Sequence, residues 1–116
     1  MVEFKPNTQF KWEIIDSKIS YQESINASFS SRIVIFKHST RCSISNMAKN
    51  RIESVNKPNN NPKCYYLDLL NDRELSNQIA YDLNVKHESP QVIIIENGKC
   101  IKHISHNKIM WKEILS

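Results

Sequence analysis

The chain has 116 residues, of which 40% are hydrophobic and 24% are charged, and its formal net charge is +4. This length suits a single domain, residues 1–116, with a hydrophobic core of its own, and the composition excludes disordered and fibrous proteins. The apolar runs are too short to span a membrane, and the N-terminal residues lack the apolar stretch of a secretory signal, so we expect a cytoplasmic protein with no membrane partner. Basic and acidic residues alternate without a basic-aromatic motif, so we expect no nucleic-acid partner.

The first third of the chain alternates predicted strands with a predicted helix. Residues 11–16 favour a short strand, and residues 17–29 have the periodicity of a helix. Residues 32–38, RIVIFKH, are rich in β-branched residues and nearly all apolar, which is typical of a strand buried on both faces. One face of the predicted helix carries Ile19, Ile25 and Phe29.

A second helix and a third strand follow. Apolar residues recur at helical spacing from about residue 42 to residue 55. They are Ile44, Met47, Ala48, Ile52 and Val55. The segment NKPNNNPK, residues 56–63, ends this helix with its two prolines, and residues 63–70, KCYYLDLL, predict a strand.

The third predicted helix has a recognisable beginning and end. Asn71 is suited to cap it, with Glu74 three residues later, as in a capping box. We expect the helix to end near Asn84. Its predicted buried stripe comprises Leu75, Ile79 and Leu83.

Asn97 and Gly98 form the strongest hairpin signal in the chain, between predicted strands at residues 91–96 and 99–105. A final helix is predicted over about residues 106–115. We expect it to bury Ile109, Met110, Ile114 and Leu115. Alternating strands and helices followed by a hairpin predict an α/β fold, in which a mixed central sheet carries helices on both faces.

The segment FKHSTRCSIS, residues 36–45, places Cys42 just after an apolar strand, at the predicted start of a helix. Ser45 occupies the position where a dithiol site would have its second cysteine. A thiol reacts as its thiolate, and a helix start lowers a cysteine pKa because free N–H groups stabilise the anion, to which Arg41 adds positive charge. The polar surroundings favour an exposed, reactive Cys42 over the alternative, a small buried hydrophobe.

Cys64 and Cys100 lie within predicted strands, where a structural role is favoured. Three cysteines are an odd number, and the chain is large enough to fold without disulfides, so we expect reduced thiols. No Cys-x-x-Cys or His-Glu-x-x-His spacing supports a metal site, and we expect none.

Three segments resemble the monothiol bacilliredoxins, bacillithiol system proteins of the YtxJ type with a thioredoxin-like fold. They are FKHSTRCSIS, the segment YYLDLLNDRELSNQIAYDLNVKHESPQ and the hairpin that follows it. The resemblance runs from about Trp12 to Trp111, and its most specific pieces are Lys-His-Ser at 37–39, Thr-x-Cys-x-Ile-Ser at 40–45 and KHESPQ at 86–91. Ser43 stands where this family commonly has proline, which bears on the rigidity of the first helical turn.

The resemblance implies a monothiol thiol-disulfide oxidoreductase with no bound cofactor and with bacillithiol as its co-substrate. Cys42 would attack the bacillithiol sulfur of a bacillithiolated client protein, and a second bacillithiol would then regenerate Cys42, because Ser45 is not a thiol. The Ser45 hydroxyl could at most donate a hydrogen bond to the Cys42 sulfur. The alternative is a thioredoxin-like binding or redox-sensing module without turnover.

The same resemblance implies which residues support Cys42. Thr40 and Arg41 precede it within the matching motif, and Ser45 follows it. His38, at the end of the strand that leads to Cys42, would tune the thiolate.

A second implied element of the site is the Ser89-Pro90 peptide bond, which the resemblance expects to be cis and beside Cys42. The Ser89 backbone would then pair in the manner of a strand with the client that bears the mixed disulfide. His87 would shape the loop before Pro90. A trans proline that only begins a strand is the alternative that the sequence leaves open.

A local excess of basic residues suits the carboxylates of the malate unit of bacillithiol. It comprises Lys37, Arg41, Lys49 and Arg51. For Lys49 and Arg51, an ordinary role as solvated helix charges remains an equal alternative.

Overall fold

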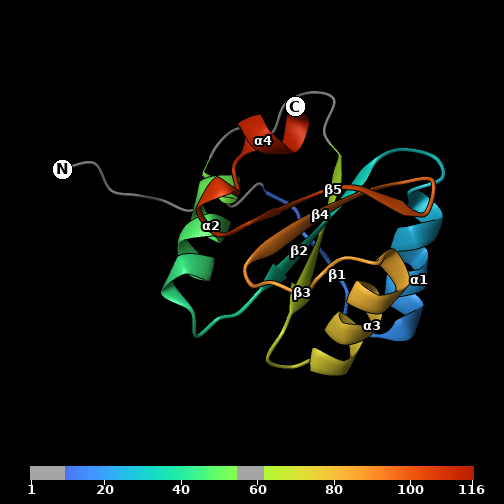
Figure 1. Cartoon of the computed structure of the whole chain (residues 1–116), viewed down its shortest axis with the longest axis horizontal. Coiled ribbons are helices and arrows are strands. Elements are labelled where there is room, and N and C mark those ends of the chain that lie inside the picture. The colour runs from blue at the N-terminus through green and yellow to red at the C-terminus, as the bar shows by residue number, and fades with distance from the viewer. Residues whose placement is uncertain (1–9, 55–61) are drawn as a thin grey trace.

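The computed structural model describes residues 10–54 and 62–116, and the strands in these ranges form one sheet in the order β1-β3-β2-β4-β5 (Figure 1). The strands are β1 (Glu13–Ile14), β2 (Ile33–His38), β3 (Lys63–Asp68), β4 (Gln91–Glu96) and β5 (Lys99–Ser105). The helices are α1 (Lys18–Ala27), α2 (Ser43–Glu53), α3 (Arg73–Leu83) and α4 (Trp111–Leu115), with a short 3-10 helix, η1 (His106–Lys108), before α4. The predicted order of strands and helices is confirmed.

Strand β2 lies at the centre of the sheet. It pairs in parallel with β3 and antiparallel with β4, and all six of its residues are buried. The edges are formed by β1, parallel to β3, and by β5, antiparallel to β4. The nearly continuous apolar run therefore predicted a doubly covered central strand correctly, because such a strand has no face in contact with water.

Helices cover both faces of the sheet, with α1 and α3 on one side and α2 and α4 on the other (Figure 1). Side chains alternate along β2, so Ile33 and Ile35 join the core under α1 and α3, while Val34 and Phe36 join the core under α2 and α4. Among the described residues, no helix has the length and apolarity that crossing a bilayer requires.

The predicted hairpin between β4 and β5 is confirmed. Asn97 and Gly98 both have positive φ, at 53° and 75°, as a tight hairpin turn of this kind requires. A Cβ atom on Gly98 would come within 2.8 Å of the Phe29 ring, so this position is also restricted by packing. The turn is held further by Ser28, whose carbonyl accepts from the Asn97 N–H and whose hydroxyl accepts from the Gly98 N–H, each at 2.9 Å.

The predicted apolar face of α1 is wrong for two of its three residues, because only Ile25 packs against the core, where it is partly buried. Ile19 and Phe29 are exposed, and the residues that α1 buries are Tyr21 and Ser24. The reason lies in polar groups that find partners: Tyr21 donates to the Asp82 carboxylate of α3 at 3.0 Å, and Ser24 donates to the carbonyl of Tyr21 at 2.6 Å. A serine that bonds to its own helix can be buried at little cost and lets the helix approach the sheet closely.

The face of helix α2 that packs against the sheet also differs from the predicted one. Ala48 and Ile52 are buried as predicted, but Ile44 and Met47 are exposed and Ser45 is buried instead. Val55, the last residue of the predicted pattern, lies outside the described residues. The buried serine is explained by its hydrogen bonds, which belong to the candidate site.

The start of α3 differs from the predicted one by one residue. Asp72, not Asn71, is the N-cap, and its side chain makes no capping bond. Asn71 instead donates to the Asp68 carboxylate at 3.1 Å and so belongs to the preceding turn. Leu75 and Ile79 are buried as predicted and Leu83 is partly buried. The helix ends at Leu83, with Asn84 as its C-cap at φ of 54°, close to the predicted end.

The predicted C-terminal helix is divided in two. Ile109 and Met110 have extended backbones, with ψ of 104° and 156°, so η1 and α4 are separate elements. Arg51 of α2 donates to the carbonyls of Ile109 and His106, at 3.0 and 3.3 Å, and thereby stabilises the irregular segment between them. Ile109 and Ile114 are buried as predicted, whereas Met110 and Leu115 are partly exposed.

Candidate active site

Cys42 lies at the N-cap of α2, after the short loop that leaves the end of β2. Its N–H donates to the Ser39 carbonyl at 3.1 Å, and its carbonyl accepts from the Asn46 N–H at 3.0 Å. The side chain is partly exposed and belongs to neither core cluster. The buried-hydrophobe alternative is therefore wrong, and the thiol is placed beside the free N–H groups of a helix start.

The other two cysteines are placed differently. Cys64 is fully buried in β3, in the core under α2 and α4, and Cys100 is partly buried in β5. Burial raises the pKa of the Cys100 thiol, which disfavours the thiolate. All three cysteines are thiols outside any disulfide, as the sequence predicted. Cys42 thus differs from both other cysteines in its position at a helix start, and from Cys64 also in its exposure.

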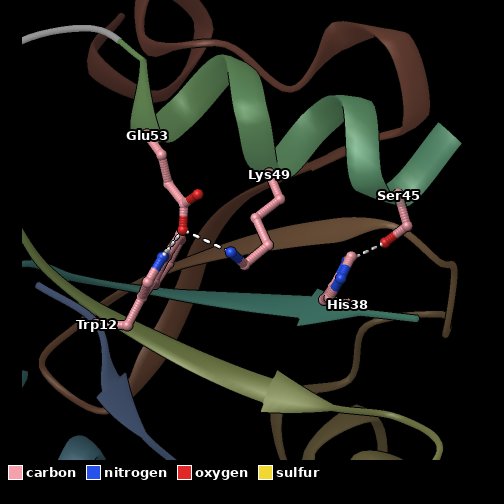
Figure 2. Close-up of polar contacts among 5 residues, drawn as sticks. All are labelled: Trp12, His38, Ser45, Lys49 and Glu53. Atoms are coloured by element: carbon pink, nitrogen blue, oxygen red, sulfur yellow. Dashed lines mark hydrogen bonds and ion pairs between the residues drawn. The ribbon is translucent and has the colours of Figure 1, made fainter. Parts of the chain in front are cut away.

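Ser45 does not serve Cys42 in the way we expected. Its side chain is fully buried, its Oγ lies 2.6 Å from His38 Nδ1, and the same oxygen accepts from the Ser39 N–H at 3.0 Å (Figure 2). The hydroxyl is committed to these two groups, so the predicted hydrogen bond to the Cys42 sulfur is wrong. Ser45 instead holds the start of the loop that carries Cys42.

His38 is the partner that orients Ser45. It is buried at the end of β2, between the rings of Phe36 and Tyr66, whose centroids each lie 5.6 Å from its own. Burial, and then the nearby Lys49, lower the pKa of His38, so the neutral imidazole is favoured. Its Nδ1 can then accept a hydrogen bond from the Ser45 hydroxyl. His38 therefore acts on the Cys42 loop through Ser45.

The predicted basic cluster does not gather around Cys42. Lys49 is paired with Glu53 at 2.7 Å, and the same carboxylate oxygen accepts from Trp12 Nε1 at 2.5 Å (Figure 2). Arg51 is bound to carbonyls of the η1 segment. Both side chains are therefore engaged in contacts of the fold, and neither is the purely solvated helix charge of the alternative interpretation. Arg41, adjacent to Cys42, is exposed and keeps its place in the candidate site.

Thr40 is exposed in the same loop as Arg41. Its carbonyl accepts from the Asn46 side chain at 3.3 Å, and this bond joins the loop to the first turn of α2. The structure thus brings Thr40 and Arg41 to the surface immediately before Cys42, and it places Ser45 and His38 beneath that loop.

Lys37 requires a correction. Its side chain is fully buried on the α1 and α3 side of the sheet, where Nζ donates to the Ser76 carbonyl at 3.1 Å and lies 3.5 Å from His87 Nδ1. A buried ammonium cannot meet the carboxylates of a dissolved thiol, so the predicted role in bacillithiol binding is wrong. Sequence analysis missed Ser76, although a lysine inside an apolar strand run is a signal that a buried polar partner must exist.

Replacing Lys37 with methionine should increase the free energy of unfolding. Burial lowers the pKa of Lys37 from 10.5 to about 8, which means that folding penalises its charge. Methionine has similar length and no charge, and replacing buried ions in this way stabilises proteins by about 1–4 kcal/mol. Below pH 8 the gain in the free energy of unfolding should be complete. Above it the gain should shrink, because folded wild-type protein then loses the proton that the unfolded chain keeps until about pH 10.5.

Urea unfolding at neutral pH and above pH 8 measures this effect, and Lys99→Met is the matched control. Lys99 is an exposed lysine at the hairpin end of β5, so its replacement should leave stability nearly unchanged. A lower stability of Lys37→Met at neutral pH would contradict the expectation.

The Ser89-Pro90 peptide bond is cis, as the family resemblance implied. Lys37 of β2 pairs with Gln91 of β4, so Pro90 lies at the end of β2 from which the Cys42 loop departs. The Pro90 carbonyl accepts from the His106 N–H at 3.1 Å. Cys42 and Pro90 therefore lie at the same end of the central strands, as the resemblance implied.

Other features of the described residues lie outside this site. A surface pocket of about 590 Å³ lies between the N-terminal ends of α1 and α3, and its lining includes Ser17, Asp72 and Arg73 but no predicted site residue. Within residues 10–54 and 62–116, no group of three or more histidine, cysteine or acidic side chains is arranged to hold a metal ion.

Residues 13–114 match the protein family described as monothiol bacilliredoxin BrxC. A solved structure described as a candidate oxidoreductase with a thioredoxin fold is 28% identical, with 89% of each chain covered and a TM-score of 0.75. Thioredoxin Mala s 13 of Malassezia sympodialis is 16% identical over 96% of this chain and 89% of its own, with a TM-score of 0.69. Thioredoxin NaTrxh of Nicotiana alata is 14% identical over 93% and 92%, with a TM-score of 0.70. These likenesses confirm the predicted thioredoxin-like fold.

Proposed function

Because this chain belongs to the monothiol bacilliredoxin family, we propose that it removes bacillithiol from protein mixed disulfides through the Cys42 thiolate. The family and the thioredoxin-like fold support a thiol oxidoreductase. One observation carries the finer proposal: a single partly exposed thiol stands at the start of α2, and the position of a second cysteine is filled by Ser45, which is bonded to His38.

The first step of the proposed cycle is a thiol-disulfide exchange. The Cys42 thiolate attacks the bacillithiol sulfur of a client protein, a new disulfide forms between Cys42 and bacillithiol, and the client sulfur leaves as a thiolate that takes up a proton. The client is thereby reduced and Cys42 is oxidised. No second cysteine of this chain is placed to continue, since Cys64 lies in the core and Cys100 in strand β5.

The second step needs a thiol from solution, and we propose free bacillithiol as this reductant. Its thiolate attacks the bacillithiol sulfur bound to Cys42, so bacillithiol disulfide forms and the Cys42 thiolate is released. Exposed Arg41 is placed to attract the malate carboxylates of bacillithiol. Three cysteines outside any disulfide suit a reducing compartment, which supports the proposed cytoplasmic location.

Selective modification tests the proposal. Incubation of the native protein with bacillithiol disulfide should add one bacillithiol to Cys42, while Cys64 and Cys100 stay unmodified until the protein is unfolded. Peptide mass spectrometry of native and urea-unfolded samples measures the three sites separately. Equal modification of Cys42 and Cys100 in the native protein would contradict the assignment of Cys42 as the reactive thiol.

A further inference from the structure

The buried ammonium of Lys37 is a charge that the chemistry of Cys42 does not use. Its side chain points to the face of the sheet opposite α2 and is fully buried. The four residues of β2 that precede it, Ile33 to Phe36, are all apolar. A lysine at such a position lowers stability unless it is paired, so its contacts indicate what it stabilises in return.

The contacts of Lys37 join three separate parts of the chain. Nζ donates to the Ser76 carbonyl of α3 and approaches His87 Nδ1 of the loop that precedes β4. The Ser76 hydroxyl lies 3.4 Å from the same ring nitrogen. Gln91, the strand partner of Lys37, donates from Nε2 to the carbonyl of Lys86 at 3.0 Å. Lys86 is therefore tied to β4 through Gln91, and His87 is tied to β2 through Lys37.

We propose that Lys37 is a positioning residue, which holds residues 86–90 in place so that the Ser89-Pro90 peptide presents a fixed backbone edge to the client protein beside Cys42. The client-binding step rests on the proposed function, whereas the attachment of residues 86–90 does not. A preset edge avoids the entropy cost of ordering a loop when the client binds.

The attachment depends on the protonation of His87. Only a neutral imidazole can accept from the Lys37 ammonium at Nδ1, and a protonated ring would place two cations 3.5 Å apart. The charged groups that face His87 are Lys37 from β2, Arg73 from α3 and the adjacent Glu88. Burial, then Lys37 and Arg73, lower the pKa of His87, so the contact persists at neutral pH and is lost below the ordinary range of a histidine.

Two substrates distinguish positioning from chemistry. The first is a bacillithiolated test protein with one surface cysteine, and the second is bacillithiol disulfide, which needs no backbone edge. In Lys37→Met the KM for the test protein should rise about tenfold or more, while the reaction with bacillithiol disulfide stays unchanged. The ratio of the rate with the test protein to the rate with bacillithiol disulfide removes any pH dependence that the two reactions share. In wild type this ratio should fall at acid pH, and in Lys37→Met it should be low and independent of pH.

A second variant tests the role of the ring. In His87→Asn the side-chain amide oxygen takes the place of Nδ1 and can still accept from Lys37, but it cannot be protonated, so the wild-type ratio at neutral pH should be retained and the acid decline should disappear. Lys99→Met serves as the control for removal of a lysine and should behave as wild type.

Amide hydrogen exchange of residues 86–89 provides a readout that does not require activity. Exchange at these amides should be faster in Lys37→Met than in wild type, even though the variant unfolds at a higher temperature. Unchanged exchange in Lys37→Met would overturn the proposal. Equal losses of reaction rate with both substrates in Lys37→Met would also overturn it, because Lys37 would then act on Cys42 itself. If the wild type releases no bacillithiol but exchange is still faster in Lys37→Met, the proposed function would be rejected and the attachment of the loop would stand.

Discussion

Replacing Cys42 with alanine should abolish the release of client thiol when bacillithiol is the only reductant. The reason is that Cys64 is buried in the core and Cys100 is partly buried with a raised pKa, so neither can supply an accessible thiolate in place of Cys42. The client would keep its bacillithiol, and the rate should fall to that of bacillithiol alone. Free client thiol, followed over time with a thiol reagent after separation from bacillithiol, measures the effect.

The matched control replaces the other two cysteines together. A Cys64→Ser, Cys100→Ser variant should retain most of the activity, although a hydroxyl at the buried Cys64 position should lower stability by about 1–3 kcal/mol. Undiminished release by Cys42→Ala would end the monothiol hypothesis. No release by the wild type would favour the alternative, a thioredoxin-like binding or redox-sensing module.

Replacing Ser45 with cysteine should convert this one-thiol site into a dithiol site. Cys42 is the N-cap of α2 and Ser45 lies three residues later, on the side that faces His38. Residues three apart on a helix have Cβ atoms about 5–6 Å apart, whereas a disulfide needs about 3.5–4.5 Å. Cys42 is the N-cap and is not yet helical, so a small backbone shift at this residue can bring the two side chains together. The mildly oxidised variant should lose two hydrogens, and bacillithiol bound to Cys42 should be expelled without a second bacillithiol.

Intact mass spectrometry of the oxidised variant tests this conversion, and Ile44→Cys is the control. Ile44 is exposed and lies two residues from Cys42, so its side chain points away and no such disulfide should form in the folded monomer. The Ser45→Cys variant should also be less stable than wild type, because the sulfur is a poor acceptor for the Ser39 N–H that the Ser45 hydroxyl accepts. Retention of both hydrogens under mild oxidant would mean that the two side chains do not share a face of the helix.

Several features of this protein could be predicted from the sequence because they depend on residues close together in the chain. The apolar run in β2 predicted the central strand, and Asn97-Gly98 predicted the hairpin, since a tight turn with two positive φ values favours these residues. Cys42 was likewise placed at a helix start by local pattern. The cis bond before Pro90 was expected only from the resemblance to a family, because an X-Pro sequence does not by itself select the cis form.

The partners of polar groups were decided by the tertiary structure alone. Lys37 appeared to belong with Arg41 in the sequence, but alternation along β2 turns it to the opposite face, towards α3 and His87. Ser45 was expected to face the Cys42 sulfur, but it bonds to a histidine seven residues earlier. Hydrogen bonds of this kind set the rotation of α2 and the contents of the site, because a buried polar group must find its partner wherever the fold places one, whatever the separation in sequence.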